Sequence, residues 1–244
     1  MKILVCISHV PDTTSKISFV DNGTKFDTNG VQFIIGPYDD YALARAIEIK
    51  EANAGTTVTV LNVGPAETEP TIRKALAIGA DDAIRVNAEP TDSLFVATQI
   101  AEHAKGYDLV LMGRESIDYN SGVVHAMVGE MLGIPSVSPV MKLDLDGTTV
   151  KMQREIEGGK ESVEASLPLV AGCQEPIAEW KIPNMRGIMS ARTKPLKVVE
   201  PKTTEASVKT QKFELPAPKG AVKMISADNV AELVTRLKTE AKVL

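Results

Sequence analysis

Apolar and polar positions alternate along the first 135 residues in blocks that have the periods of strands and helices. Short apolar runs that are typical of strands buried on both faces cover residues 2–8, 57–63, 83–86 and 109–112. Apolar residues three and four positions apart predict helices that follow, in residues 37–54, 65–78, 92–105 and 124–132. A strand and then a helix, four times in succession, predict a Rossmann-like α/β fold, a mostly parallel sheet with helices on both faces.

The pattern changes after Pro135. Residues 136–140 predict another strand, and residues 141–170 alternate like antiparallel hairpins with turns at Asp146-Gly147 and Gly158-Gly159. Residues 169–173 predict a last buried strand. Near the N-terminus, the Asn-Gly turns at 22–23 and 29–30 predict a small hairpin.

The C-terminal part has a different character. Residues 174–220 hold six of the fourteen prolines, are locally basic and have no useful apolar period. Such a stretch is either a linker or an arm laid on another surface. A final helix is predicted with Ser226 as its cap and an apolar stripe that includes Val230 and Leu233. It can dock on its own sheet or on a partner subunit. We therefore divide the chain into a 1–173 domain and a 174–244 arm.

Composition narrows the class of protein. The chain has 244 residues, and its 43% hydrophobic content suffices for a large core. A net charge of −5 argues against a nucleic-acid partner. No stretch approaches the roughly 18 apolar residues of a membrane span, and no signal peptide is evident, so we expect a cytoplasmic protein without membrane insertion. Cys6 and Cys173 lack metal-like spacing and are expected to be buried free thiols.

Candidate chemistry lies at the carboxyl ends of the predicted parallel strands, where such sheets bind ligands. Four turns meet there, at residues 6–9, 36–39, 63–66 and 113–124. A nucleotide fits this edge, with its ring against the backbone and its phosphate at the helix start after Asp118. The G-x-G-x-x-G and G-x-x-x-x-G-K-[ST] motifs are absent, so phosphoryl transfer is not expected.

No catalytic constellation assembles from the reactive residues. The only imidazoles are His9, His103 and His125, of which His103 is expected on a solvated helix face. His125 lies where it can contact a phosphate or simply be exposed. No serine or cysteine stands in a nucleophile-elbow pattern. The residues by themselves do not indicate an enzyme.

Four ordered blocks resemble the β (small) subunit of electron-transfer flavoprotein. Residues 63–66 and 71–81 are similar to the family's VSCGP…TIRTALAMGAD block, and residues 108–118 to its DLVLLGKQAID segment. Residues 152–168 follow the Arg-Glu, Gly-Gly-x-Glu and Leu-Pro signature. Residues 182–195 resemble the LPNIMKAKKKP region of the family's protruding loop. The likeness extends from about residue 2 to residue 199.

This resemblance implies an electron-carrier subunit without catalysis of its own. It pairs with an α subunit that holds the FAD, and it buries one AMP as a structural ligand. The family's cofactor-binding positions correspond to Cys6, Gly36, Pro37, Tyr38, Asp39, Val63, Gly113, Asp118, Asn120, Ser121, Gly122, Val123 and Val124. The Gln and Gly that many members place in this loop are replaced by Val123 to His125, so backbone N–H groups, with Ser121 or His125, would carry the phosphate.

The protruding loop implies transient partners. In the family it docks acyl-CoA dehydrogenases, and electrons then pass to a quinone oxidoreductase. The anchoring leucine corresponds to Ile182, and the docking residues to Ile182, Pro183, Met185 and Arg186. Two alternatives stay open: a flavin-bifurcating subunit, in which a second FAD replaces AMP and accepts hydride from NADH, and a stand-alone nucleotide-binding module of the stress-protein type.

Overall fold

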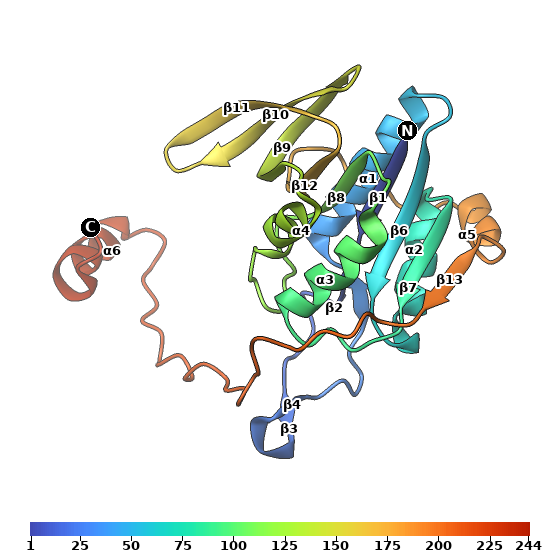
Figure 1. The fold of residues 1–244 in the computed structure, drawn as a ribbon. Helices are drawn as coiled ribbons and strands as arrows, with labels where there is room; N and C mark the ends of the chain where they lie inside the picture. Colours follow the sequence, from blue (N-terminus) through green and yellow to red (C-terminus); the bar gives the residue numbers. More distant parts are fainter. The chain divides into compact units, whose positions relative to one another are not determined.

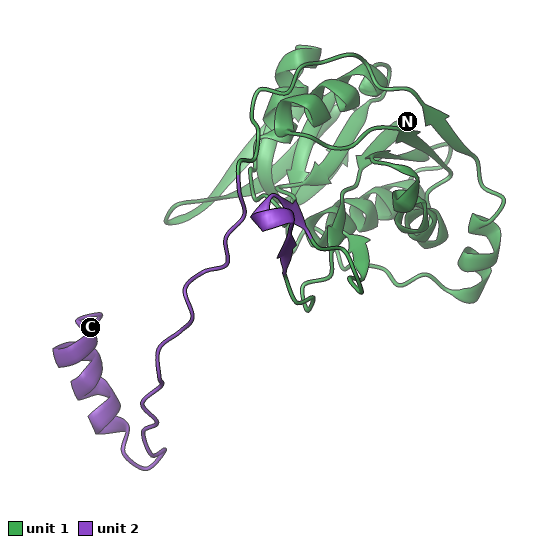
Figure 2. Ribbon diagram, turned by 90° about the horizontal axis from the view of Figure 1, so that it is seen from below, with its two compact units in different colours: residues 1–17, 27–211 green, residues 18–26, 212–244 purple.

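The computed structural model describes residues 1–244, which form two compact units. Unit 1 comprises residues 1–17 and 27–211, and unit 2 comprises residues 18–26 and 212–244 (Figure 2). Part of the predicted C-terminal arm, up to residue 211, thus belongs to the same compact unit as the sheet. None of the helices combines the length and the apolar composition that crossing a lipid bilayer demands.

Unit 1 is built on one nine-stranded sheet (Figure 1). Its strands are β1 (Lys2–Cys6), β6 (Thr57–Val63), β7 (Asp82–Val86), β8 (Leu109–Gly113), β9 (Ser136–Asp146), β10 (Thr149–Ile156), β11 (Gly159–Ser166), β12 (Leu169–Cys173) and β13 (Leu196–Val199). They lie in the order β11-β10-β9-β12-β8-β1-β6-β7-β13. All neighbours from β9 to β13 in this order pair in parallel, and β10 and β11 extend the sheet as antiparallel hairpins.

Helices cover both faces of the sheet, as the sequence predicts. They are α1 (Pro37–Ala52), α2 (Glu69–Ile78), α3 (Ser93–Ala104) and α4 (Val124–Leu132). One core joins α1 and α2 to the face that carries Ile3 and Val5, and a second core joins α3 and α4 to the face with Leu4 and Cys6. Neighbouring residues of β1 therefore point to opposite cores, which explains why the parallel strands read as continuous apolar runs. The Rossmann-like α/β class is confirmed.

The structure corrects the expectation that residues 174–220 lack regular structure. Helix α5 (Met185–Ala191) forms there, with the Asn184 side chain accepting a hydrogen bond from the Gly187 N–H at 2.8 Å. Strand β13 pairs in parallel with β7 and becomes the edge of the sheet. Neither element is long enough to show a period in the sequence. Tertiary contacts hold them instead: Arg73 of α2 donates to the carbonyl oxygens of Ala191 and Lys194, at 2.8 and 2.7 Å.

Other boundaries also differ from the predicted ones. The first strand ends at Cys6, and a separate strand β2 (His9–Pro11) pairs with β5 (Phe33–Ile35). The strand predicted to end at residue 140 continues to Asp146, because it also forms the first arm of the hairpin with β10. A short 3₁₀ turn, Ala66–Thr68, precedes α2. The predicted hairpins and their turns after Asp146 and Ile156 are present.

Unit 2 contains a hairpin, a segment of the arm and the C-terminal helix. The hairpin pairs β3 (Phe19–Val20) with β4 (Lys25–Phe26) around the predicted Asn-Gly turn. The Phe213 N–H donates to the Gly23 oxygen at 2.7 Å, and the Phe213 and Phe19 rings stack with centroids 5.0 Å apart. Helix α6 (Val230–Arg236) continues as a π-helical turn, Leu237–Ala241. The predicted cap is wrong, because Asn229 caps this helix and not Ser226.

Candidate functional site

The chain changes direction in the sheet between β1 and β8. From β1 it proceeds through β6 to β7, and it then crosses to β8 on the other side of β1. At such a switch point the connections leave in opposite directions and open a crevice outside the carboxyl ends of the strands. Here that edge is formed by Cys6, at the end of β1, and Gly113, at the end of β8. Val63 ends the neighbouring strand β6.

Asp39 joins the two strand ends at this switch point. One of its carboxylate oxygens accepts hydrogen bonds from the N–H and the hydroxyl of Ser8, at 2.8 and 2.5 Å. The other oxygen accepts from the Gly113 N–H at 2.8 Å. Burial raises the pKa of Asp39 to about 6, against the opposing effect of these hydrogen bonds. The hydrogen bonds to Ser8 and Gly113 occupy both carboxylate oxygens of Asp39, so this side chain links the ends of β1 and β8.

Two of the predicted site residues are glycines because of this carboxylate. A Cβ atom on Gly113 would lie 2.6 Å from an Asp39 oxygen and 2.7 Å from the Cβ of Tyr38. A Cβ atom on Gly36 would lie 2.5 Å from the other Asp39 oxygen. Real side chains do not tolerate such distances, so the sequence must keep both positions free of a Cβ. Gly36 and Pro37 therefore begin α1 in close contact with the ends of β1 and β8.

The two thiols near the crevice are both free and buried, as predicted. Burial, together with the Asp39 carboxylate, raises the pKa of Cys173 to about 12, and the same causes raise the pKa of Cys6 still further. A thiol reacts as its thiolate, so neither side chain has nucleophilic character in this environment. Cys6 can offer a ligand its backbone, but not redox or covalent chemistry.

Tyr38 faces an arginine that the sequence did not assign. The guanidinium carbon of Arg114 lies 5.3 Å from the centre of the Tyr38 ring, and the Arg114 side chain donates to the Gln174 amide oxygen at 2.8 Å. The Gln174 amide donates in turn to Glu155 of β10. This polar chain connects the crevice to the hairpins. The only sign of Arg114 in the sequence is that a charged residue directly follows a buried strand.

The loop before α4 has the backbone geometry of an anion site. Asn120 and Gly122 have left-handed φ values of +52° and +59°, and Val123 follows with a right-handed conformation. Alternation of this kind directs successive N–H groups toward one point. No side chain caps α4, so the N–H groups that begin at Val124 are available to an acceptor. Asp118 accepts from the Tyr119 N–H, and Ser121 accepts from Ser93 at 3.0 Å.

Two buried polar atoms beside this loop have no hydrogen-bond partner. They are the Ser116 hydroxyl and the Nδ1 atom of His125. His125 is half-buried rather than exposed, and burial lowers its pKa against the opposing effect of the Gly122 backbone. A third unpartnered atom, the amide oxygen of Asn62, lies on β6 next to Val63. Unsatisfied atoms of this kind fit the hydroxyl and phosphate groups of a nucleotide. Asn62 gave no signal in the sequence, whereas Ser116 lies within the turn predicted at residues 113–124.

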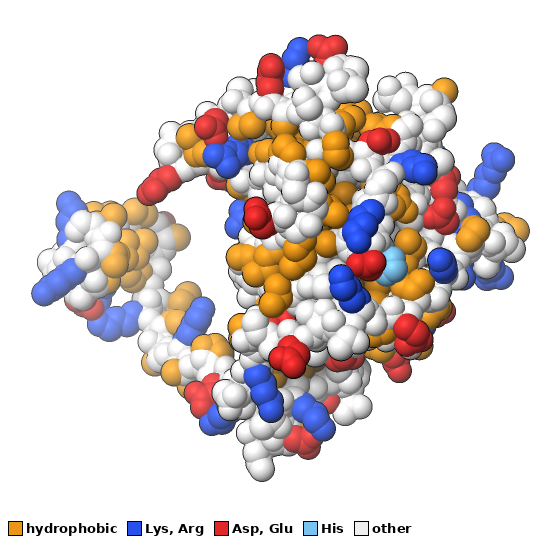
Figure 3. All heavy atoms as spheres, in the orientation of Figure 1, with side chains coloured by type: hydrophobic (Ala, Val, Ile, Leu, Met, Phe, Trp, Pro, Cys, Tyr) orange, Lys and Arg blue, Asp and Glu red, His pale blue; other side chains and the backbone are white.

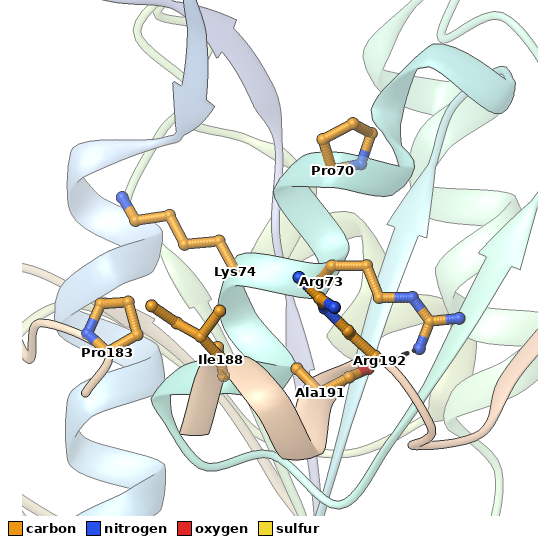
Figure 4. Close-up of a pocket in the computed structure, with 8 residues that line it drawn as sticks. Pro70, Arg73, Lys74, Pro183, Ile188, Ala191 and Arg192 are labelled. Atoms are coloured by element: carbon orange, nitrogen blue, oxygen red, sulfur yellow. Dashed lines mark hydrogen bonds between the residues drawn. The ribbon is translucent and has the colours of Figure 1, made fainter. Parts of the chain in front are cut away.

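The predicted docking residues lie around α5. Ile182 and Met185 have 76% and 74% of their surface exposed, and Arg186 is exposed as well. Pro183 lines a cavity of about 540 Å³ between α2 and α5. The other residues that line it are Pro70, Arg73, Lys74, Ala77, Ile188, Ala191 and Arg192 (Figure 4). An exposed apolar cluster beside basic side chains suits a transient protein contact.

The parallel sheet covered by helices on both faces, with its switch point between β1 and β8, defines a Rossmann-like protein. A model of the electron transfer flavoprotein domain matches residues 23–204. The chain is 35% identical to an electron transfer flavoprotein subunit beta of Bacillus subtilis over 260 aligned residues, which cover both chains completely. It is 35% identical to the same subunit of Syntrophomonas wolfei, over 91% of this chain and 88% of the relative. A mitochondrial beta subunit of Arabidopsis thaliana is 30% identical over the full length of both. The chain belongs to the electron transfer flavoprotein beta-subunit family, which confirms the resemblance.

Proposed function

We propose that this chain is the β subunit of a heterodimeric electron-transfer flavoprotein that binds AMP as a structural ligand. The α subunit carries the FAD that accepts and releases electrons. The β subunit packs against the α subunit and so helps to position that cofactor. Acyl-CoA dehydrogenases deliver the electrons, which leave toward a quinone oxidoreductase. Burial raises the pKa of both thiols, so neither Cys6 nor Cys173 is available as a nucleophile.

The left-handed Asn120 and Gly122 in the loop before α4, together with the uncapped start of this helix, support AMP most directly. The N–H groups at this helix start and the left-handed Gly122 offer hydrogen bonds to a phosphate, and the helix dipole favours the negative charge. The Ser116 hydroxyl and the Nδ1 atom of His125 add two buried polar atoms without a hydrogen-bond partner. The adenine ring would meet the backbone near Cys6 and Val63, where the parallel strands end.

If the phosphate is held in this way, AMP should bind much more tightly than adenosine. A phosphate with several charge-assisted hydrogen bonds contributes about 3 kcal/mol, or roughly a hundredfold in affinity. Isothermal titration of the nucleotide-free protein with AMP and with adenosine measures this ratio. Equal affinities for the two ligands would contradict a phosphate site at α4, whatever the affinity for the ring.

The C-terminal helix is the segment that we propose for the α subunit. Val230, Leu233 and Val234 are exposed with 61%, 43% and 40% of their surface, and so are Val222 and Met224 of the preceding segment. Hydrophobic side chains are visible on this segment at the left of Figure 3. A helix with such a stripe gains stability when a partner covers it. The part of the chain from residue 174 onward would then serve both contacts, with the dehydrogenase at α5 and with the α subunit at α6.

A further inference from the structure

The part of the C-terminal arm that follows β13, residues 200–211, is fastened to α3 by a buried glutamine. Gln99 has no exposed surface, and its amide oxygen accepts from the Lys202 N–H at 2.8 Å. Its amide nitrogen donates to the Lys202 oxygen at 2.9 Å. The side chain thus pairs with both backbone groups of one arm residue, as a neighbouring strand would. This contact fixes the arm just after β13 (Figure 1).

A second side chain of the same region holds the arm a few residues later. One carboxylate oxygen of Asp92 caps α3 by accepting from the Phe95 N–H at 2.8 Å. The other oxygen accepts from the N–H and hydroxyl of Ser207, at 2.5 and 2.9 Å, and from the Val208 N–H at 2.9 Å. Desolvation alone would raise the pKa of Asp92, but these hydrogen bonds outweigh it and hold the pKa below its usual value. The ionised Asp92 carboxylate therefore caps α3 and holds the arm at the same time.

Ser93, the residue after Asp92, connects the contact between Asp92 and the arm to the loop before α4. The Ser93 hydroxyl donates to the Ser121 hydroxyl at 3.0 Å. Ser121 lies in the loop that we propose for the phosphate, and its hydroxyl keeps its own proton to donate. A phosphate that accepts this proton would strengthen the Ser93 bond, because hydrogen bonds in a chain polarise one another.

We propose that Asp92 and Ser93 couple the nucleotide loop to the part of the C-terminal arm that follows β13. An ordered loop fixes Ser93 and the first turn of α3, and this turn presents Asp92 to Ser207 and Val208. By reciprocity, a firmly held arm orders the loop and increases its affinity for a nucleotide phosphate. The identity of the ligand rests on the proposed function, whereas the coupling is a property of the chain itself.

Two substitutions cut this connection at different points. In Asp92→Asn, the amide oxygen can still cap α3, since asparagine and aspartate are comparable caps, but the NH₂ group faces the Ser207 and Val208 N–H groups. Ser93→Ala removes only the hydroxyl that reaches Ser121 and leaves the arm contacts untouched. Thr98→Ala is the matched control, because the Thr98 hydroxyl donates to Leu94 within α3.

Amide hydrogen exchange of the full-length, ligand-free chain tests the coupling. We expect Asp92→Asn to speed exchange in the arm, residues 203–211, and also about fivefold at Asn120 in the loop, whose N–H donates to the Ser116 oxygen at 2.8 Å. Ser93→Ala should speed exchange in the arm, although it touches no arm residue, and Thr98→Ala should change neither segment. If each variant affects only the segment that it contacts, the proposal is overturned.

Addition of AMP tests the same coupling by perturbing the loop and measuring the response of the arm. AMP should slow exchange of residues 203–211 in the unmodified chain and have no such effect in Ser93→Ala. AMP that binds without slowing the arm contradicts the coupling. If AMP does not bind at all, the proposed ligand is wrong, and the ligand-free exchange still decides whether loop and arm are coupled.

Discussion

At pH 5, replacing Asp39 with asparagine should lower the free energy of unfolding by about 1–2 kcal/mol. The protonated carboxyl can donate to the Ser8 hydroxyl and still accept from the N–H groups of Ser8 and Gly113. An asparagine can satisfy two of these three groups, and it leaves the part-buried Ser8 N–H opposite its own NH₂ group. Denaturant unfolding of the purified protein measures the difference, and a weaker affinity for AMP should accompany it, because Gly113 opens the nucleotide loop.

The difference in the free energy of unfolding between the unmodified chain and Asp39→Asn should become smaller as the pH rises to 8. The pKa of Asp39 in the folded chain, about 6, lies above its ordinary value of 3.8, so the folded state binds the proton more tightly. The stability that this proton supplies is present in full below about pH 4 and is lost as the pH rises to about 6. The asparagine variant does not titrate, so the two unfolding curves approach each other.

Asp40 provides the matched control, because it is the next residue of α1 and burial raises its pKa to about 6 as well. It bridges no strand ends, and its nearest cation is Lys74, with 3.9 Å between the Nζ atom and a carboxylate oxygen. Asp40→Asn should therefore leave the chain equally stable below about pH 4 and make it more stable, by an increasing amount, as the pH rises through 5 to 8. If the two variants behave alike, the account of Asp39 as the link between β1 and β8 is wrong.

Ile182→Ala should reduce kcat/KM for electron transfer from an acyl-CoA dehydrogenase about 30-fold. Truncation of an apolar anchor that a partner buries costs about 2 kcal/mol or more of binding free energy. The substitution therefore weakens the complex with the dehydrogenase and does not destabilise the fold. Because 76% of Ile182 is exposed, its removal opens no cavity in this chain. The rate of flavin reduction in the reconstituted heterodimer, with the dehydrogenase varied, gives the ratio.

Ile156 of β10 is a suitable control, since it is also an exposed isoleucine, with 43% of its surface accessible. Ile156→Ala should leave both flavin reduction and thermal stability unchanged within error. A loss of stability in Ile182→Ala that equals its loss of activity would show that the residue supports the fold and does not anchor a partner.

The fold could be read from the sequence where single elements carry a strong period. The strands buried on both faces, the helices with apolar stripes and the hairpins each have a pattern that can be recognised within their own residues. The four residues of β13 and the seven of α5 did not, because their stability comes from β7 and from Arg73, which lie far away in the sequence. Asn229 displaced Ser226 as the cap of α6 for a similar reason, since several polar residues there could cap a helix and only geometry selects one.

The position of the candidate site is a prediction from the sequence, whereas the contacts among its residues come from the structure. Parallel strand ends predict the crevice, and the resemblance supplied the residues around it. That Asp39 is engaged by Ser8 and Gly113, and that Asn62, Ser116 and Arg114 lie beside the crevice, depends on contacts between separate strands. No local pattern encodes such contacts. The link from Asp92 to Ser207 spans 115 positions and was equally invisible.

The central claim is that this subunit holds AMP while its α partner holds the only flavin. Mass spectrometry of the ligands that acid releases from the purified heterodimer tests it most directly. We expect one AMP and one FAD per heterodimer. Two FAD molecules and no AMP would identify the bifurcating alternative, and the absence of any adenine nucleotide beyond the α subunit's FAD would contradict the account of the crevice.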